Sequence, residues 1–273
     1  MSLDQTIVKH YEHGSLEKAL LAAVTASGKD AQGALAHGDI SAFDEFHIGG
    51  RAATTEFSGQ IDLPRGAKVL DVGSGLGGPS RYFAAERGWK IEGIDLTPEY
   101  VEVATKLSQK VGLASAVNYR VANAAKLPFA DATFDGAYML HVGMNIPDKK
   151  SVFAEIRRVL KPGGLFAIYD IFRESDGAFL YPVPWSGAPE TNFIDRIAAY
   201  KELLGASGFR IEKERNRREF ALAAFQQQRQ RAAQGAAPTQ IAMGASAPQK
   251  AGNLAKLVAD GVVAPAEIVS RAV

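Results

Sequence analysis

The sequence predicts an α/β fold, a doubly wound parallel sheet with helices on both faces. From residue 68 onwards, short apolar runs alternate with amphipathic helical patterns, which is the arrangement of a covered parallel sheet. The first run, residues 68–72, leads into glycines at positions 73, 75, 77 and 78 and then Pro79. A strand, a tight turn and a helix start therefore follow one another, and such a unit brings backbone N–H groups close to a ligand.

Composition places the chain among ordinary globular proteins and argues against several other classes. Of its 273 residues 47% are hydrophobic, and 31 basic residues nearly balance 30 acidic ones, so no nucleic-acid partner is expected. The chain has no cysteine, which excludes disulfides and thiolate chemistry, and no metal site is expected. No apolar run approaches the ~20 residues of a membrane span. Because the N-terminus lacks the order of a signal peptide, a cytoplasmic location is expected.

Residues 1–50 precede the alternating region and are expected to form an N-terminal helical arm. Ser15 is the predicted cap of a helix that begins at residue 16 and closes near Gly28. A helix before the first strand lies outside the crossover pattern, so it must pack over an end or edge of the sheet. It is either a lid over a ligand or a packing arm. Residues 43–51 combine aromatic residues and a histidine with two glycines and are expected to form a tight loop.

Helix stop and start signals define the remaining elements. Pro98 suits the first position of a helix, and residues 161–164, Lys-Pro-Gly-Gly, end another. Residues 181–185 are too rich in proline for regular structure, and residues 235–247 read as a loop of low specificity. The predicted elements after the first strand are helix 79–87, strand 90–94, helix 97–111, strand 117–121, strand 134–139, helix 152–160, strand 165–171, helix 193–204, strand 209–213, helix 217–233, helix 248–260 and a final strand at 266–270.

Candidate binding residues follow the strands. In an open parallel sheet, ligands bind beyond the carboxyl ends of the strands, near the topological switch point. Asp95, at the end of the second strand, lies about 20 residues beyond the glycines, where a carboxylate accepts both ribose hydroxyls of a nucleotide cofactor. The glycines satisfy both the dinucleotide pattern G-x-G-x-x-G and, starting from Asp71, D-x-G-x-G-x-G. The turn by itself leaves the cofactor open between two nucleotides.

Four segments together resemble the class I S-adenosylmethionine-dependent methyltransferases. They are residues 69–78, 93–95, 127–135 and 158–164, in that family's order and spacing. Within the family, the chain is similar to the ubiquinone/menaquinone C-methyltransferases and the sarcosine/dimethylglycine N-methyltransferases, over roughly residues 43–215. The resemblance implies a seven-stranded sheet whose last strand, at about 265–271, is antiparallel. Residues 51–273 would form the methyltransferase domain, with a helical insertion at about 217–262.

The resemblance also implies S-adenosylmethionine as the cofactor and S-adenosylhomocysteine as its product. The glycine turn would approach the methionine part, Asp95 would hold the ribose and Leu96 would lie against the adenine. Asn123 stands where the family often has an aspartate near the adenine amino group, so the charge is lost but an acceptor oxygen remains. The implied cofactor-binding residues are Asp71, Gly73, Ser74, Gly75, Asp95, Leu96, Asn123, Ala124 and His141.

The resemblance says less about the residues that bind the molecule that accepts the methyl group. An acceptor that carries a proton needs a base, and His47 and His141 are the catalytic candidates, with a packing or loop-ordering role as the alternative for each. Aromatic residues near 181–185 would suit an amine cation through cation–π contact, and a packing role is the alternative here too. The implied substrate-binding residues are Phe46, His47, Met144, Asn145, Tyr181 and Trp185.

The expected reaction is methyl transfer to a nitrogen, oxygen or carbon of a small molecule by in-line displacement. One rival is an NAD(P)-dependent oxidoreductase, which the glycine spacing permits. The sequence has no Tyr-x-x-x-Lys pair, and such an enzyme would leave residues 127–129 and 161–164 unexplained. The other rival is a non-catalytic S-adenosylmethionine-binding protein, since fold does not guarantee chemistry. Oligomeric state stays open, a homodimer being one option.

Overall fold

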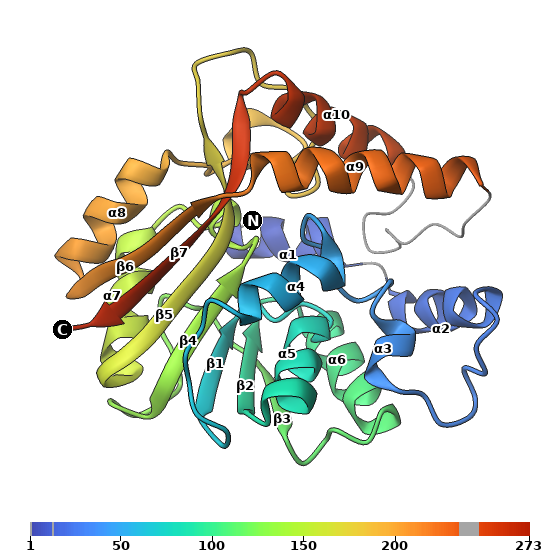
Figure 1. The fold of residues 1–273 in the computed structure, drawn as a ribbon, viewed down its shortest axis with the longest axis horizontal. Helices are drawn as coiled ribbons and strands as arrows, with labels where there is room; N and C mark the ends of the chain where they lie inside the picture. The colour runs from blue at the N-terminus through green and yellow to red at the C-terminus, as the bar shows by residue number, and fades with distance from the viewer. Residues whose placement is uncertain (1, 13, 235–245) are drawn as a thin grey trace.

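The computed structural model describes residues 2–12, 14–234 and 246–273, which fold around one mixed sheet with helices on both faces (Figure 1). Its seven strands lie in the order β3-β2-β1-β4-β5-β7-β6. The predicted fold class is therefore confirmed. The strands are β1 Lys68–Val72, β2 Lys90–Asp95, β3 Val117–Val121, β4 Phe134–Leu140, β5 Leu160–Arg173, β6 Phe209–Asn216 and β7 Val263–Ala272.

The helices within the described residues divide into an N-terminal set, the crossover helices and a pair before the last strand. The N-terminal set is α1 Leu3–Tyr11, α2 Leu16–Ala26, α3 His37–Ile40 and α4 Gly50–Ser58. The crossover set is α5 Gly78–Tyr82 with the π-helical turn η1 Phe83–Arg87, α6 Pro98–Lys110, η2 Gly143–Asn145, α7 Lys149–Val159, η3 Pro189–Thr191 and α8 Ile197–Ala206. The last pair is α9 Arg218–Ala233 and α10 Ala247–Ala259.

Strand order places the switch point beside β1. The chain winds outward from β1 through β2 to β3 and then returns to β4, on the other side of β1. All of these neighbours are parallel, so a crevice opens at the carboxyl ends of β1 and β4. The last strand, β7, runs antiparallel to both β5 and β6, as the resemblance implies.

Two apolar layers, one on each face of the sheet, form most of the core. Successive side chains of a strand point to opposite faces, so Tyr138 of β4 packs with α4 and η1, whereas Met139 packs with α7 and α8. The central strands β1, β4, β5 and β7 are buried on both faces, which explains why they read as apolar runs in the sequence, whereas the edge strands β3 and β6 are partly exposed.

The N-terminal arm has two parts with different packing. Leu16, Leu20 and Val24 of α2 are buried in one cluster with Tyr100 and Val103 of α6, so α2 packs beside the sheet. By contrast, α1 has no buried residue. Ser15 is the N-cap residue of α2, as predicted, but its side chain makes no capping hydrogen bond.

Glu99 takes the place of that side-chain cap. The backbone N–H groups of Gly14 and Leu16 donate to its carboxylate at 3.0 and 3.1 Å. A carboxylate from α6 therefore satisfies the start of α2, a long-range contact that no local pattern could indicate.

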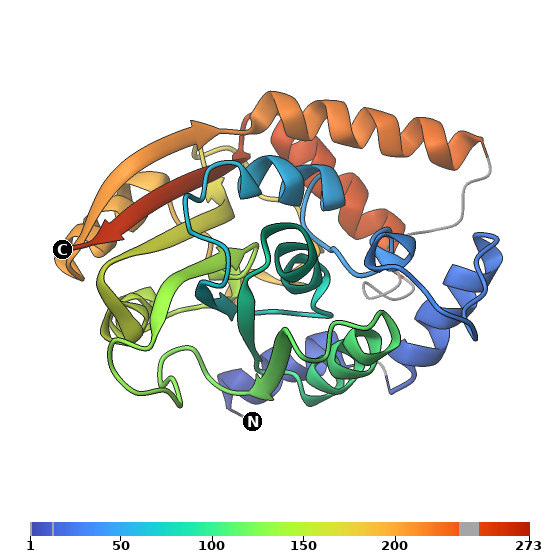
Figure 2. The same ribbon diagram turned by 60° about the horizontal axis from the view of Figure 1, so that its bottom comes forward.

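The two helices α9 and α10 occupy the predicted insertion between β6 and β7. They lie side by side across one end of the sheet in both views (Figures 1 and 2). Their buried residues pack with Val183 and Trp185 and with the end of β5. Most of the predicted loop at 235–247 lies outside the described residues.

Several element boundaries differ from the prediction. The predicted helix 79–87 is interrupted at residue 83, where it continues as a π-turn, and the predicted helix 193–204 begins only at Ile197. The short helices α1, α3 and α4 were not predicted, because segments of 9, 4 and 9 residues contain too few turns for a clear helical period. Among the described residues no helix is long and apolar enough to cross a membrane.

Candidate functional site

The glycine turn after β1 forms the centre of the candidate site. Gly73, Gly75 and Gly77 all have positive φ, at 74°, 53° and 76°. A Cβ added to Gly73 would lie 2.4 Å from Val142 Cγ2, whereas one added to Gly75 would meet nothing within 4 Å. The turn is therefore tight on one side and open on the other, and its open side lines a cavity of about 1740 Å³.

Two carboxylates, those of Asp71 and Asp95, accept hydrogen bonds at the glycine turn after β1. Asp71 is buried and accepts hydrogen bonds from Ser80 Oγ at 2.5 Å and Tyr138 Oη at 2.8 Å, and burial raises its pKa to about 7. Asp95 accepts from the backbone N–H of Gly75 and of Thr97, both at 2.9 Å. Burial raises the pKa of Asp95 as well, and the two backbone bonds oppose that rise. The ends of β1 and β2 are thus joined through one carboxylate.

The residues after β3 complete this end of the cavity. Leu96, Asn123 and Ala124 line it together with Asp95. The side-chain oxygen of Asn123 accepts from the N–H of Ala125 at 2.8 Å, and its amide donates to Asp4 Oδ2 at 2.9 Å. A carboxylate from α1 therefore lies beside the position that is often acidic in the resembled family, and sequence reasoning missed it.

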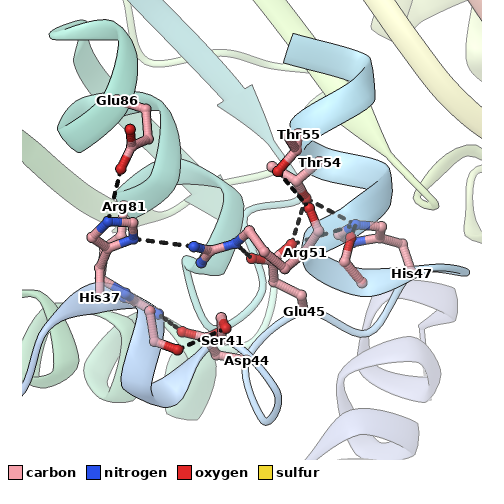
Figure 3. Close-up of polar contacts among 12 residues, drawn as sticks. His37, Ser41, Asp44, Glu45, His47, Arg51, Thr54, Thr55, Arg81 and Glu86 are labelled. Atoms are coloured by element: carbon pink, nitrogen blue, oxygen red, sulfur yellow. Dashed lines mark hydrogen bonds and ion pairs between the residues drawn. The ribbon is translucent and has the colours of Figure 1, made fainter. Parts of the chain in front are cut away.

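A buried polar network holds residues 44–54 against the glycine turn (Figure 3). Arg81 of α5 is fully buried and donates to Asp44 Oδ2 at 2.6 Å and to the carbonyl of Leu76 at 2.5 Å. Glu45 accepts from Arg51 Nε at 2.5 Å and from the hydroxyl of Thr54. Both carboxylates are nine-tenths or more buried, so the arginines supply the counter-charge that burial requires.

Burial dominates the titration of these carboxylates. It raises the pKa of Asp44 to about 6 and also raises the pKa of Glu45, while Arg81 and Arg51 oppose the rise. The packing around the pair is tight, since a Cβ on Gly78 would lie 2.5 Å from Glu45 Cγ. Residues 44–50 are consequently positioned by the turn itself.

The two candidate histidines lie near each other, with ring centroids 5.9 Å apart. His47 Nε2 is 3.1 Å from the carbonyl oxygen of Gly50, which can only accept, so this nitrogen carries the proton. His141 has a positive φ of 52°, and its Nδ1 accepts from the N–H of Ile48 at 3.3 Å. Burial lowers the pKa of His47 to about 4 and that of His141 well below its ordinary value, so both rings are neutral at pH 7.

The predicted substrate residues are only partly brought together. Phe46, His47, Met144, Asn145 and Trp185 line the same cavity as the glycine turn. Tyr181 does not line it. Its hydroxyl accepts from the amide of Asn192 at 2.9 Å, so this ring packs behind the wall rather than in it.

Several lining residues come from segments that the sequence marked only as irregular or helical. Tyr11 of α1 donates to Asn145 Oδ1 at 3.1 Å, and Phe225 and Leu254 bring α9 and α10 to the cavity. The available signal was the helical spacing of Phe220, Ala224 and Phe225, which places them on one face of the predicted helix 217–233. Within the described ranges, no group of three His, Asp or Glu could hold a metal ion.

Comparison with known proteins gives consistent matches. The family model described as "Methyltransferase domain" matches residues 70–168. The chain is 38% identical over 111 residues to methyltransferase phqN of Penicillium fellutanum, covering 41% of this chain and 34% of that protein. It is 35% identical over 133 residues to methyltransferase GfsG of Streptomyces halstedii, covering 49% and 48%. The chain thus spans half or less of the length of these curated relatives.

The fold has a full-length counterpart among solved structures. Geranyl diphosphate C-methyltransferase from Streptomyces coelicolor A3(2), solved with S-adenosyl-L-homocysteine, superposes with a TM-score of 0.70 at 15% identity and covers 100% of this chain and 99% of that one. At this identity the likeness concerns the fold alone. The family model and the relatives favour a methyltransferase over the NAD(P)-dependent oxidoreductase that the glycine spacing permits.

Proposed function

We propose that this chain, which carries a methyltransferase domain of the class I S-adenosylmethionine-dependent type, transfers a methyl group to a small-molecule acceptor. The observation that supports this most directly is one continuous cavity of about 1740 Å³. It runs from the glycine turn and Asp95 to residues of α9 and α10. A pocket for one drug-sized ligand has roughly 300–1,000 Å³, so this cavity can hold a nucleoside cofactor and a second molecule together.

The cofactor end fits S-adenosylmethionine. The open side of Gly75 lets a ligand approach the backbone, and the hydroxyl of Ser74 is buried in the lining without a hydrogen-bond partner among the described residues. Asp95 uses part of its acceptor capacity on two backbone N–H groups and can take ribose hydroxyls with the rest. Leu96, Ala124, and Asn123 with its neighbour Asp4 would border the adenine.

When bound, S-adenosylmethionine supplies a methyl carbon that its sulfonium already activates. The chain has to align the acceptor with that carbon and keep water out. Residues 44–50, held by the Arg81 network, and the loop after β4, which carries His141, border this region. The catalytic assignment of His47 and His141 stays a prediction. So do the N-terminal lid, the cytoplasmic location, the lack of a nucleic-acid partner and the oligomeric state.

Binding and turnover together test the proposal. Calorimetry with S-adenosylhomocysteine should show one site per chain, and radiolabelled methyl transfer should be found with some member of a panel of amines, phenols and quinol precursors. Binding without any transfer across the panel would favour the non-catalytic alternative. Binding of NAD(P) in place of S-adenosylhomocysteine would contradict the proposal itself.

A glycine pair sharpens this test. Gly73→Ala should weaken S-adenosylhomocysteine binding by about 10- to 100-fold, because the new Cβ meets Val142 and the positive φ adds strain. Gly163→Ala is the matched control, since Gly163 has the same φ of 74° but nothing within 4 Å of an added Cβ. Gly163 lies outside the cavity, so equal affinity losses in both variants would mean that a general loss of stability, rather than the shape of the turn, weakens binding.

A further inference from the structure

The acceptor end of the cavity has a buried apolar wall, and the charged lining residues of α9 and α10, which are Arg229, Arg231, Lys256 and Asp260, are all exposed. Six buried residues of one hydrophobic cluster line it, and they come from six separate segments of the chain. These residues are Ile48, Met144, Ile171, Trp185, Phe225 and Leu254. Such a surface stabilises a ligand by removing apolar area from water, at roughly 25 cal/mol per Å². It therefore favours an acceptor with a large apolar body.

The apolar wall contains no carboxylate, and the carboxylates elsewhere in the lining already accept hydrogen bonds or form ion pairs, which disfavours a small cationic acceptor. A buried amine cation needs a counter-charge, because an unpaired buried charge is strongly unfavourable. Each lining carboxylate has a partner within the described residues. The pairs are Asp4 with Asn123, Asp44 with Arg81, Glu45 with Arg51, Asp71 with Ser80 and Tyr138, Asp95 with the backbone of Gly75 and Thr97, Asp148 with Ser151, and Asp260 with Lys256.

His141 offers one polar group in this region. Its Nδ1 accepts from the N–H of Ile48, so the neutral ring carries its proton on Nε2. This Nε2–H is buried and has no hydrogen-bond partner among the described residues, although His141 lines the cavity. A buried donor without a partner is costly unless a ligand accepts from it. An oxygen of the acceptor would do so, whereas an ammonium group, which only donates, would not.

We propose that the acceptor is a bulky, largely apolar molecule that presents a phenol-type hydroxyl, with its apolar body against α9 and α10 and its oxygen accepting from His141 Nε2–H. This rests on the proposed function and narrows it to oxygen methylation. The hydroxyl proton leaves to bulk water as the acceptor binds in its phenolate form. A lone pair of the oxygen then forms the new bond to the methyl carbon, and the electron pair of the broken C–S bond stays on sulfur. His141 acts by stabilising the phenolate.

A ligand panel tests the class directly. With S-adenosylhomocysteine at saturation, 4-octylphenol should bind at least about 10-fold more tightly than phenol, because its chain buries additional apolar area. With S-adenosylmethionine, it should be methylated faster than sarcosine or phosphoethanolamine. Faster methylation of either amine, or no binding of 4-octylphenol to a protein that binds S-adenosylhomocysteine, would overturn the acceptor class and leave the proposed function standing. Failure to bind S-adenosylhomocysteine would instead defeat the proposed function.

A pair of tryptophan substitutions tests the position of the wall. Ala251 of α10 lines the cavity, whereas Gln249, two residues earlier on the same helix, is exposed and does not. Ala251→Trp should weaken 4-octylphenol binding by at least about 10-fold, since the ring fills space that the ligand needs. Gln249→Trp should leave it unchanged, and both variants should bind S-adenosylhomocysteine like the parent. Unchanged 4-octylphenol binding in Ala251→Trp would remove α10 from the site.

The role of His141 is tested by varying the acidity of the acceptor. Loss of the donor in His141→Ala should slow methylation of 4-octylphenol by about 10- to 100-fold, the usual effect of one hydrogen bond to a charged group. The 2,6-difluoro analogue of 4-octylphenol ionises more readily, so its rate of methylation should fall much less in His141→Ala. His141→Asn, which tolerates the positive φ and keeps an N–H donor, should restore part of the rate. Equal losses for both phenols would mean that His141 only packs.

Discussion

The two ends of the cavity differ in the kind of residue that lines them and in the interactions that hold those residues in place. At the cofactor end, buried charges and backbone groups are joined by directed hydrogen bonds, as between Arg81 and Asp44 or between Asp95 and the N–H of Gly75. At the acceptor end, the wall is uncharged and its residues touch through apolar contact. Directed bonds fix one geometry for a polar ligand, whereas apolar contact is non-directional and tolerates repacking. The comparison suggests a cofactor site of narrow shape beside an acceptor site that can change its specificity.

The largest expected effect comes from removing a buried charge at the cofactor end. Arg81→Met should lower the free energy of unfolding by roughly 3–5 kcal/mol, because Asp44 is left buried without its counter-ion. Denaturant titration measures this loss. Lys106→Met is the control, since Lys106 forms its ion pairs with Glu17 and Glu102 at the surface and should matter little. Similar losses in both variants would contradict the importance given to the buried network.

A smaller effect is expected from the apolar end. Leu254→Ala should lower the free energy of unfolding by roughly 2 kcal/mol, at the low end for a buried leucine because one side of Leu254 already faces the cavity. Its affinity for S-adenosylhomocysteine, measured by calorimetry, should be unchanged. Leu204→Ala, in the core between α8 and the sheet, should cost more stability because no open space adjoins it. Weaker cofactor binding in Leu254→Ala would mean that the two ends are coupled.

The third predicted effect is spread over several pH units, as a change in how the free energy of unfolding varies with pH. The pKa of Asp71 is raised from 3.8 to about 7 in the folded protein, so the folded state holds this proton more tightly than the unfolded chain does. Between about pH 4 and pH 7, unfolding releases the proton, and this group makes stability fall as the pH rises. Asp71→Asn removes this contribution to the pH dependence. As the pH rises from about 4 to 7, the free energy of unfolding of the parent should therefore fall relative to that of the variant, by up to about 1.4 kcal/mol for each pH unit.

His47 acts in the opposite sense, because its pKa is lowered to about 4 in the folded protein and stability therefore rises with pH up to about 6.5. His47 is present in both the parent and Asp71→Asn. The difference between their free energies of unfolding therefore reports on Asp71 alone. Chemical denaturation at several pH values gives the two curves. Parallel curves between pH 4 and pH 7 would show that Asp71 titrates normally.

Much of the cofactor end could be predicted from the sequence because its signals are local. The apolar run 68–72, the glycines after it and the following Pro79 lie within a dozen residues, and Asp95 follows at a spacing set by one helix and one strand. Burial on both faces likewise made the central strands recognisable as apolar runs. Asp4, Asp44 and Arg81 could not be predicted, since each finds its partner across the fold.

What the sequence by itself determined was therefore the order of strands and helices, the turn and the kind of cofactor. Only the tertiary structure decided the partners of the charges and the composition of the acceptor wall. It placed Tyr181 behind that wall and Trp185 in it, although the two are four residues apart. The physical reason is that hydrogen-bonded turns follow from neighbouring residues, whereas a cavity follows from whichever distant surfaces the packed elements leave facing one another.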